Sequence, residues 1–102
     1  MNNLVVVGRL VSGVDLKTSE NNEKMCSFKL AVPRPFKNID GTYDTDFISC
    51  VALNLSAMKF HDYFKKGDLI GVKGRLQCQD VDGKMVVIVE KLSFLSNGKA
   101  SD

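Results

Sequence analysis

The sequence predicts a small all-β barrel of five strands, with one α-helix between the third and the fourth strand. Apolar and polar residues alternate along most of the chain, turn residues separate the alternating runs, and a helical period follows residue 54. With 102 residues, the chain is long enough for one domain with a single hydrophobic core. We therefore expect one domain over residues 1–95 and a short flexible end over residues 96–102.

The first two strands are expected in the N-terminal third of the chain. Residues 4–11 are rich in valine and leucine, Gly8 is a place where this strand can bulge or bend, and a kinked continuation toward Leu16 is an alternative. After a polar turn, residues 26–32 alternate as a second strand with an apolar face. Lys29 belongs to the other face and therefore points away from the core.

A projecting hairpin loop is predicted over residues 34–43. Proline cannot donate a ladder hydrogen bond, so Pro33 and Pro35 are expected to end regular strand pairing before a run of turn residues. Phe36 lies between Pro35 and Lys37 in this polar loop, where an aromatic side chain has little core to join. We therefore expect the Phe36 ring to be exposed and to contact a ligand.

The third strand, residues 46–53, alternates most strictly. Its compact face contains isoleucine, cysteine and alanine, and its second face contains Phe47, Ser49, Val51 and Leu53. A small domain can bury only one of these faces. If the compact face lines the core, the Phe47 ring stays outside near basic residues, as in a surface on which bases stack.

The segment after the third strand predicts the helix. Asn54 or Ser56 is expected to cap its start, and Gly67 is expected to end it. Lys65 and Lys66 would then lie in the last turn, where cations interact favourably with the helix dipole.

Two further strands are expected in the last third of the chain. Residues 69–78 form a glycine-punctuated fourth strand, and Asp82 with Gly83 predicts the hairpin into a fifth strand over residues 85–89. Five strands with one helix between the third and the fourth have the element order of the OB-fold, a partly open barrel that binds oligonucleotides or sugars. Fold alone does not set function.

The composition restricts the chemistry. The net charge is +2, from 14 Lys and Arg against 12 Asp and Glu, which allows a polyanionic partner without demanding one. The three cysteines lie far apart and His61 is the single histidine, so we expect neither a metal site nor a cofactor. No run approaches the ~20 apolar residues that span a bilayer. We expect a cytoplasmic location.

Six blocks of sequence carry a resemblance to a known family. They are residues 1–10 (MNNLVVVGRL), 28–32 (FKLAV), 34–36 (RPF), 46–51 (DFISCV), 63–67 (YFKKG) and 71–76 (GVKGRL). In this order and spacing they resemble the bacterial single-stranded-DNA-binding proteins, over roughly residues 1–95. The resemblance implies an OB-fold homotetramer, built from dimers, that wraps single-stranded DNA in the nucleoid during replication, recombination or repair.

The resemblance also assigns residues to the DNA path. Phe47 stands where the family has a stacking aromatic, Phe36 lies near a second such position, and Tyr63 and Lys66 fall close to the path. Leu53 and Val81 occupy positions where many members carry aromatics, and Tyr43 and Phe60 are candidates to replace those rings.

Basic residues are interleaved with these aromatics. Arg34 and Lys37 flank Phe36, Lys29 shares an outward face with Lys17, and two cations repeat along the fourth strand. Such cations can neutralise phosphates. The predicted nucleic-acid-binding residues are Lys29, Arg34, Phe36, Lys37, Tyr43, Phe47, Leu53, Tyr63, Lys66, Lys73 and Arg75.

Two other functions stay open. The first is an OB-fold accessory subunit that holds replication or recombination proteins on the same outer face, suggested by the lack of tryptophan and by the end of the sequence at Asp102. Family members usually continue into a linker and an acidic tip that recruits partners, so the resemblance implies a short form without that tip. Either a shortened piece or a naturally short variant of phage, plasmid or cellular origin fits.

The second alternative is a metal-dependent nuclease. Asp44 with Asp46, or Asp80 with Asp82, could form a two-carboxylate magnesium site. Turn chemistry explains both pairs more simply, and no nucleophile, base and orienting group occur together. We therefore expect no enzymatic activity.

Overall fold

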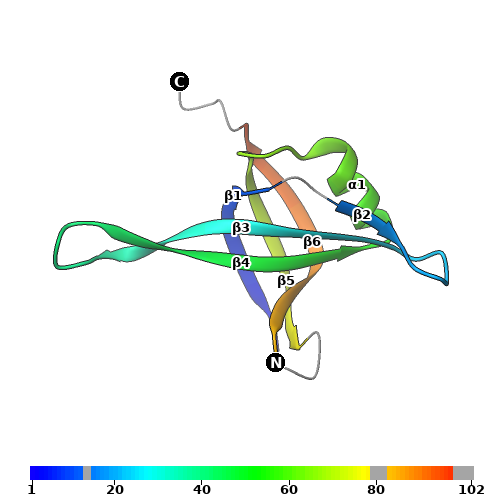
Figure 1. Cartoon of the computed structure of the whole chain (residues 1–102), viewed down its shortest axis with the longest axis horizontal. Helices are drawn as coiled ribbons and strands as arrows, with labels where there is room; N and C mark the ends of the chain where they lie inside the picture. Colours follow the sequence, from blue (N-terminus) through cyan, green and yellow to red (C-terminus); the bar gives the residue numbers. More distant parts are fainter. Residues whose placement is uncertain (13–14, 79–82, 98–102) are drawn as a thin grey trace.

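The computed structural model describes residues 1–12, 15–78 and 83–97, and for residues 55 and 56 the backbone alone. In this described part of the chain (Figure 1), the elements in chain order are β1 (Leu4–Leu10), β2 (Asp15–Thr18), β3 (Lys24–Lys37), β4 (Tyr43–Leu53), α1 (Leu55–Tyr63), β5 (Leu69–Cys78) and β6 (Met85–Ser96).

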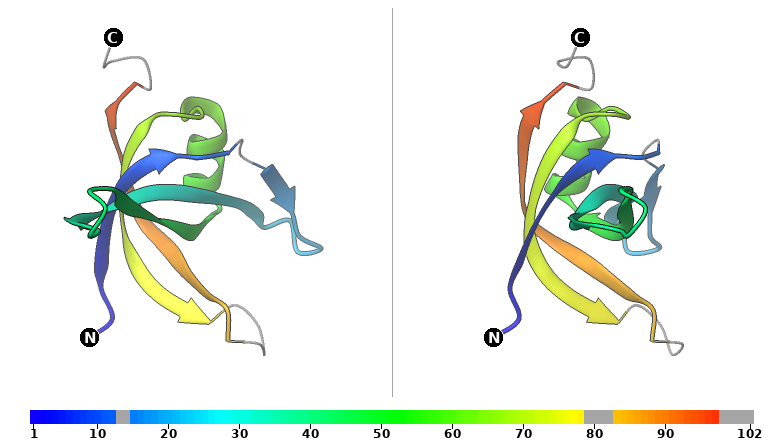
Figure 2. Two further views of the ribbon diagram at one scale, coloured as in Figure 1. Left: turned by 60° about the vertical axis from the view of Figure 1, so that its left-hand side comes forward. Right: turned by 90° about the vertical axis from the view of Figure 1, so that its left-hand side faces the viewer.

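One curled sheet forms the barrel. The strand order is β1-β5-β6-β4-β3-β2, and β1 also pairs with β3 through Arg9 and Leu10, which closes the sheet on itself. The contact between β4 and β6 is parallel and joins Cys50 to Val87 and Val51 to Ile88. Helix α1 lies at one end of this barrel (Figure 2). The predicted OB-fold barrel with a single helix is therefore confirmed.

The strands differ from the prediction at several of their boundaries. The first strand ends at Leu10, and its kinked continuation is the separate strand β2, which pairs with β3. β6 extends to Ser96, beyond the predicted fifth strand. β3 runs through both prolines to Lys37, with a shift of register between Pro33 and Lys37. The prolines are tolerated because every second N–H of a two-stranded ribbon points away from its partner.

Helix α1 ends earlier than predicted. Asn54 is the N-cap residue, with φ of 55° and no side-chain hydrogen bond to the helix, and the helix ends at Tyr63 instead of near Gly67. The carboxylate of Asp68 accepts a hydrogen bond from the Lys65 N–H at 2.8 Å, and the Gly67 N–H donates to the Leu10 carbonyl at 2.8 Å. Because these contacts take up backbone groups after the helix, its predicted last turn is a loop.

Two glycines allow the barrel strands to approach closely. A Cβ atom on Gly8 would lie 2.7 Å from the Ala31 carbonyl oxygen, where β1 meets β3. A Cβ atom on Gly74 would overlap the Ile88 carbonyl oxygen, where the register between β5 and β6 shifts. The glycines in these strands predicted tight curvature, and the close approach that they allow is needed to close the barrel.

The core fills the space between the barrel and α1. The Phe60 ring is fully buried and stacks on Phe28 at 4.0 Å and on Phe64 at 4.9 Å between ring centroids. The suggestion that Phe60 replaces a base-stacking ring is therefore wrong, because helical packing turns this ring into the barrel.

Two cysteines also belong to this core. The Cys26 thiol donates to the Ala57 carbonyl at 3.2 Å, and desolvation raises the pKa of Cys50 to about 12.

Candidate nucleic-acid interface

The outer surface of β3 and β4 carries the predicted base-stacking ring. On this surface Ala31 lies opposite Phe47, and Lys29 lies opposite Ser49. Phe47 is 60% exposed, whereas Cys50, from the other face of β4, is buried in the core. The small methyl side chain of Ala31 leaves the ring uncovered by its cross-strand neighbour. The exposure predicted for Phe47 is confirmed.

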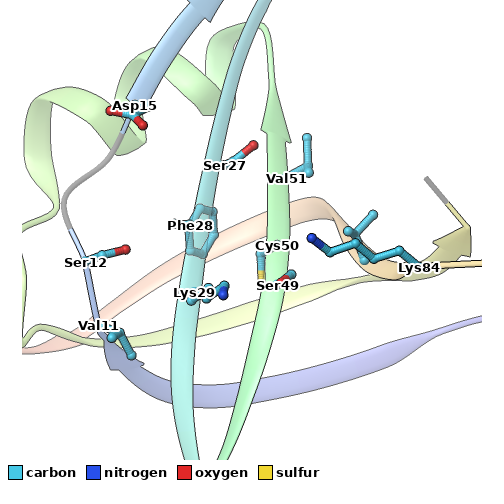
Figure 3. A pocket seen from close by; sticks show the side chains of 11 residues that line it. Val11, Ser12, Asp15, Ser27, Phe28, Lys29, Ser49, Cys50, Val51 and Lys84 are labelled. Carbon is cyan, nitrogen blue, oxygen red and sulfur yellow. The ribbon is translucent and has the colours of Figure 1, made fainter. Parts of the chain in front are cut away.

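A pocket of about 420 Å³ opens on the same surface (Figure 3). Lys84 reaches toward β4 from the position before β6, and Ser12 and Asp15 lie on the other side of the strand pair. The pocket combines the ammonium groups of Lys29 and Lys84 with hydroxyls, apolar walls and, at its Asp15 side, one carboxylate. Ammonium groups beside apolar walls can hold a phosphate and a base. Its lining residues are Val11, Ser12, Asp15, Ser27, Phe28, Lys29, Ser49, Cys50, Val51, Lys84 and Val86.

An apolar patch borders this pocket on the outer side of the barrel. Val51 is buried there against Val86 and Ile88, with Met25 packed beside them. Val51 thus lies on the predicted outer face but is covered by β6, which the alternation within one strand could not reveal. A further pocket of about 240 Å³ continues past this patch, lined by Lys17, Thr18, Ser19, Glu23, Met25 and Leu53.

Beyond the barrel, residues 33–47 of β3 and β4 and their turn form a two-stranded projection, here called the arm (Figure 1). Phe36 and Tyr43 lie on the arm with 74% and 51% of their surface exposed, and Lys37 pairs with Tyr43 in the β3–β4 register. The exposure expected for Phe36 is confirmed. The arm therefore adds two more accessible rings beyond Phe47.

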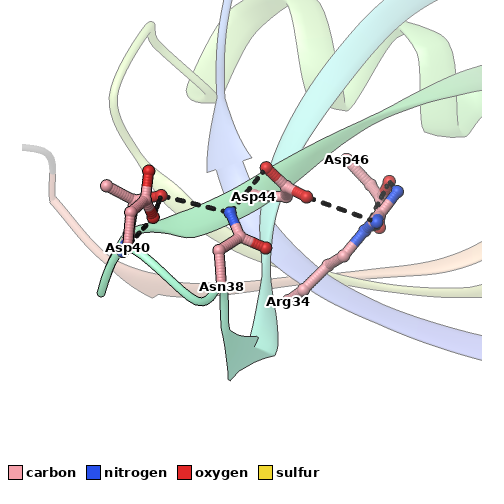
Figure 4. A network of polar contacts seen from close by, with 6 residues as sticks. Arg34, Asn38, Asp40, Asp44 and Asp46 are labelled. Carbon is pink, nitrogen blue, oxygen red and sulfur yellow. Dashed lines mark hydrogen bonds and ion pairs between the residues drawn. The ribbon is translucent and has the colours of Figure 1, made fainter.

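The arm also contains a polar network (Figure 4). The Arg34 guanidinium donates to both carboxylate oxygens of Asp46, at 2.9 and 3.1 Å, and forms an ion pair with Asp44 at 3.6 Å. Asn38 donates to Asp44 at 3.2 Å. The hydrogen bond from Arg34 lowers the pKa of Asp46, and the same contact raises the pKa of Arg34. The network fixes Arg34 and both carboxylates to each other.

The remaining predicted residues lie on other parts of the barrel and at the end of α1. Lys73 is exposed on β5, and the Arg75 guanidinium lies 3.5 Å from the Glu90 carboxylate of β6. Tyr63, at the end of α1, is exposed beside a pocket of about 360 Å³, and Lys66 follows in the next loop. That pocket is lined by Lys59, Tyr63, Phe64, Glu90, Lys91 and Leu92.

The predicted residues therefore form three groups. The arm and the outer surface of β3 and β4 unite Lys29, Arg34, Phe36, Lys37, Tyr43, Phe47 and Leu53, while β5 holds a second group and the end of α1 a third. The sequence interpretation missed Lys84 because it follows a turn and belongs to no alternating run. Val81, where the family has an aromatic, lies outside the described residues.

The described residues show neither a cluster of metal ligands nor a membrane-spanning helix. Over residues 1–12, 15–78 and 83–97, no three His, Cys, Asp or Glu side chains gather as metal ligands would. Asp44 and Asp46 face Arg34, and the pair Asp80 and Asp82 lies outside the described residues. In that same part of the chain, no helix has the length and apolar character that a bilayer crossing requires.

Comparison with known proteins gives one consistent result. The model of the single-strand binding protein family matches residues 1–95. The chain is 40% identical over 93 residues to a single-stranded DNA-binding protein of Oceanobacillus iheyensis and 42% identical over 96 residues to one of Bacillus cereus. These matches cover 88% and 91% of this chain but 58% and 56% of the relatives, so the chain spans just over half of their length.

A solved structure agrees with the barrel. A deletion mutant of the single-stranded DNA binding protein from Thermus aquaticus superimposes with a TM-score of 0.77 at 23% identity, covering 94% of this chain and 51% of the other. At this identity the likeness establishes the shared fold.

Proposed function

This chain belongs to the single-strand binding protein family, and from this premise we propose that it binds single-stranded DNA with little dependence on base sequence. The observation that carries the proposal is the exposed Phe47 ring on the outer surface of β3 and β4, beside a pocket flanked by Lys29 and Lys84. Stacking on an aromatic ring tolerates any base because every base has a π-face. The lysines would neutralise the phosphates between stacked bases.

The rings and cations have separate roles in this proposal. Phe47, Phe36 and Tyr43 are placed to stack bases along the arm, and Leu53 provides an apolar contact at the other end of the surface. Lys29, Lys37 and Lys84 are the phosphate contacts on this side. Tyr63, Lys66, Lys73 and Arg75 would extend the path around the barrel, supported by the second pocket beside α1.

We also propose self-association, as a tetramer built from dimers. Among the described residues, the first half of β1 pairs with β5 on one edge, and its other edge carries pairing to β3 only at Arg9 and Leu10. Val5 and Val7 are exposed on the same strand. An apolar strand with an open edge favours pairing with another chain. Light scattering in solution tests this assignment, and a monomer would contradict it.

The biological role follows from the ligand. A protein that covers single strands would protect DNA in the cytoplasm and nucleoid during replication, recombination or repair, with proteins of those processes as further partners. Binding would be stoichiometric and without turnover, since the proposed contacts hold DNA and include no reacting group.

A titration with poly-dT tests the proposed function. We expect binding whose log affinity falls with log salt by about 0.7 per neutralised phosphate, and much weaker binding to duplex DNA. No detectable binding to poly-dT at low salt would refute the proposal. A Phe47→Ala variant that keeps DNA binding but loses a replication partner would favour an accessory protein-binding role instead.

A further inference from the structure

Arg34 is placed differently from the other cations of the interface. Its guanidinium contacts Asp46 through Nη2 at 2.9 Å and through Nε at 3.1 and 3.3 Å, and Nη1 lies 3.6 Å from Asp44. The Nε–Nη2 edge of the guanidinium, which suits bidentate recognition, is thus occupied by Asp46, and Nη1 faces Asp44. By contrast, Lys29 lines the open pocket on the barrel.

The position of this ion pair within the arm supports the same distinction. Successive side chains of a strand point to opposite faces, so Asp46 leaves β4 on the face opposite to Phe47. Arg34 contacts Asp46 (Figure 4) and therefore belongs to that reverse face. A phosphate next to a base stacked on Phe47 would therefore lie across the strand from the guanidinium.

The charge of the arm makes it unfavourable for Arg34 to leave its carboxylates and contact a phosphate instead. The arm carries two cations, Arg34 and Lys37, against three carboxylates, Asp40, Asp44 and Asp46. If Arg34 moved to a phosphate, Asp44 and Asp46 would remain uncompensated beside a polyanion. Like charges brought together in this way repel each other.

We propose that Arg34 is a positioning residue, which braces the arm through Asp46 and Asp44 and does not contact phosphate. The inference rests on the proposed function, because it concerns how the arm presents its rings to DNA. The brace ties β3 to β4 where the register shifts between Pro33 and Lys37, next to Phe36. Losing it would let the two strands and their rings move independently, and the orientation needed for stacking would be lost.

Two charge-neutral double variants test the brace. Arg34→Gln with Asp46→Asn removes the ion pair, and Arg34→Asp with Asp46→Arg reverses it, so neither changes the net charge. Poly-dT affinity is measured for both variants between about 50 and about 200 mM salt. Lys29→Gln is the control for loss of a phosphate contact, and thermal unfolding checks that each barrel is intact.

The brace predicts that the pair-deleting variant binds severalfold more weakly, by the same factor at every salt concentration. The pair-reversing variant should recover wild-type affinity, since the reversed pair can still join the strands. If Arg34 instead contacts phosphate, both variants should lose a contact like Lys29→Gln. The ratio of wild-type to variant affinity should then shrink about 2.6-fold over a fourfold rise in salt, from a slope change of ~0.7.

The remaining outcomes of this experiment also distinguish the brace from a phosphate contact. Wild-type affinity in the pair-deleting variant would refute the brace, because the arm would not need it. If the reversed variant does not fold, the salt dependence of the pair-deleting variant alone separates the two roles. Absence of poly-dT binding by the wild-type chain would refute the proposed function, whereas binding that is indifferent to both variants would refute only the role of Arg34.

Discussion

Replacing Phe47 by alanine should weaken DNA binding while leaving the barrel stable. The ring is 60% exposed and faces the methyl group of Ala31 across the strand pair, so its removal leaves no internal cavity. Surface substitutions of this kind usually change the free energy of unfolding by less than about 0.5 kcal/mol. Stacking of one base on an aromatic ring contributes about 1–3 kcal/mol, which corresponds to about a 5- to 150-fold loss of affinity.

The assay is a titration of poly-dT at fixed salt together with thermal unfolding of the same samples. Phe47→Tyr should keep most of the affinity because it retains a ring, and Phe47→Leu should lose it although it retains apolar bulk. Phe94→Ala is a matched control, since Phe94 is 50% exposed but lies on β6 away from this surface. Unchanged affinity of Phe47→Ala, or a large fall in its melting temperature, would refute the reasoning.

Three further predictions concern charge, thiols and strand packing. Lys29→Gln combined with Lys84→Gln should reduce the slope of log affinity against log salt by ~1.4 in a salt titration, because two phosphate contacts are lost. An unchanged slope in the double variant would show that the pocket does not lie on the DNA path. Burial raises the pKa of Cys50 to about 12, so a thiol reagent at about pH 8 should label the exposed Cys78 first and should reach Cys50 only on unfolding. Mass spectrometry of the labelled protein measures the order of modification. Gly74→Ala should lower stability by about 1–3 kcal/mol in denaturant unfolding, because its Cβ would overlap the Ile88 carbonyl, and a neutral effect would contradict the close approach of β5 and β6.

The sequence predicted those features that depend on neighbours along the chain. The alternation of β4 predicted which side of the strand Phe47 occupies, because the period of two is a property of a single strand. The place of Phe36 between Pro35 and Lys37 likewise predicted its exposure. The OB-fold followed from the order of elements, which turn residues and periodicity mark locally.

The features that were mispredicted or not foreseen depend on contacts between distant segments. Helix α1 ends before Lys65 because Asp68 accepts the Lys65 N–H and Gly67 donates to Leu10 of β1. β3 continues past Pro33 because β4 is its pairing partner there. The contact of Arg34 with Asp46 was not foreseen, because it depends on the register that brings two strands together, while the assignment of Arg34 to the DNA path stays a prediction. Such pairings cannot be predicted from the periodicity of one strand.

The parallel seam between β4 and β6 has a consequence for motion of the barrel. Only Cys50 with Val87 and Val51 with Ile88 are in register there among the described residues, whereas β3 and β4 pair along most of their length. Few shared hydrogen bonds make a seam the first part of a sheet to open. Amide hydrogen exchange should therefore be faster at the seam than along the β3–β4 ribbon. Because Val51 lines the pocket beside Lys29, such opening would alter the width of that pocket without unfolding the arm.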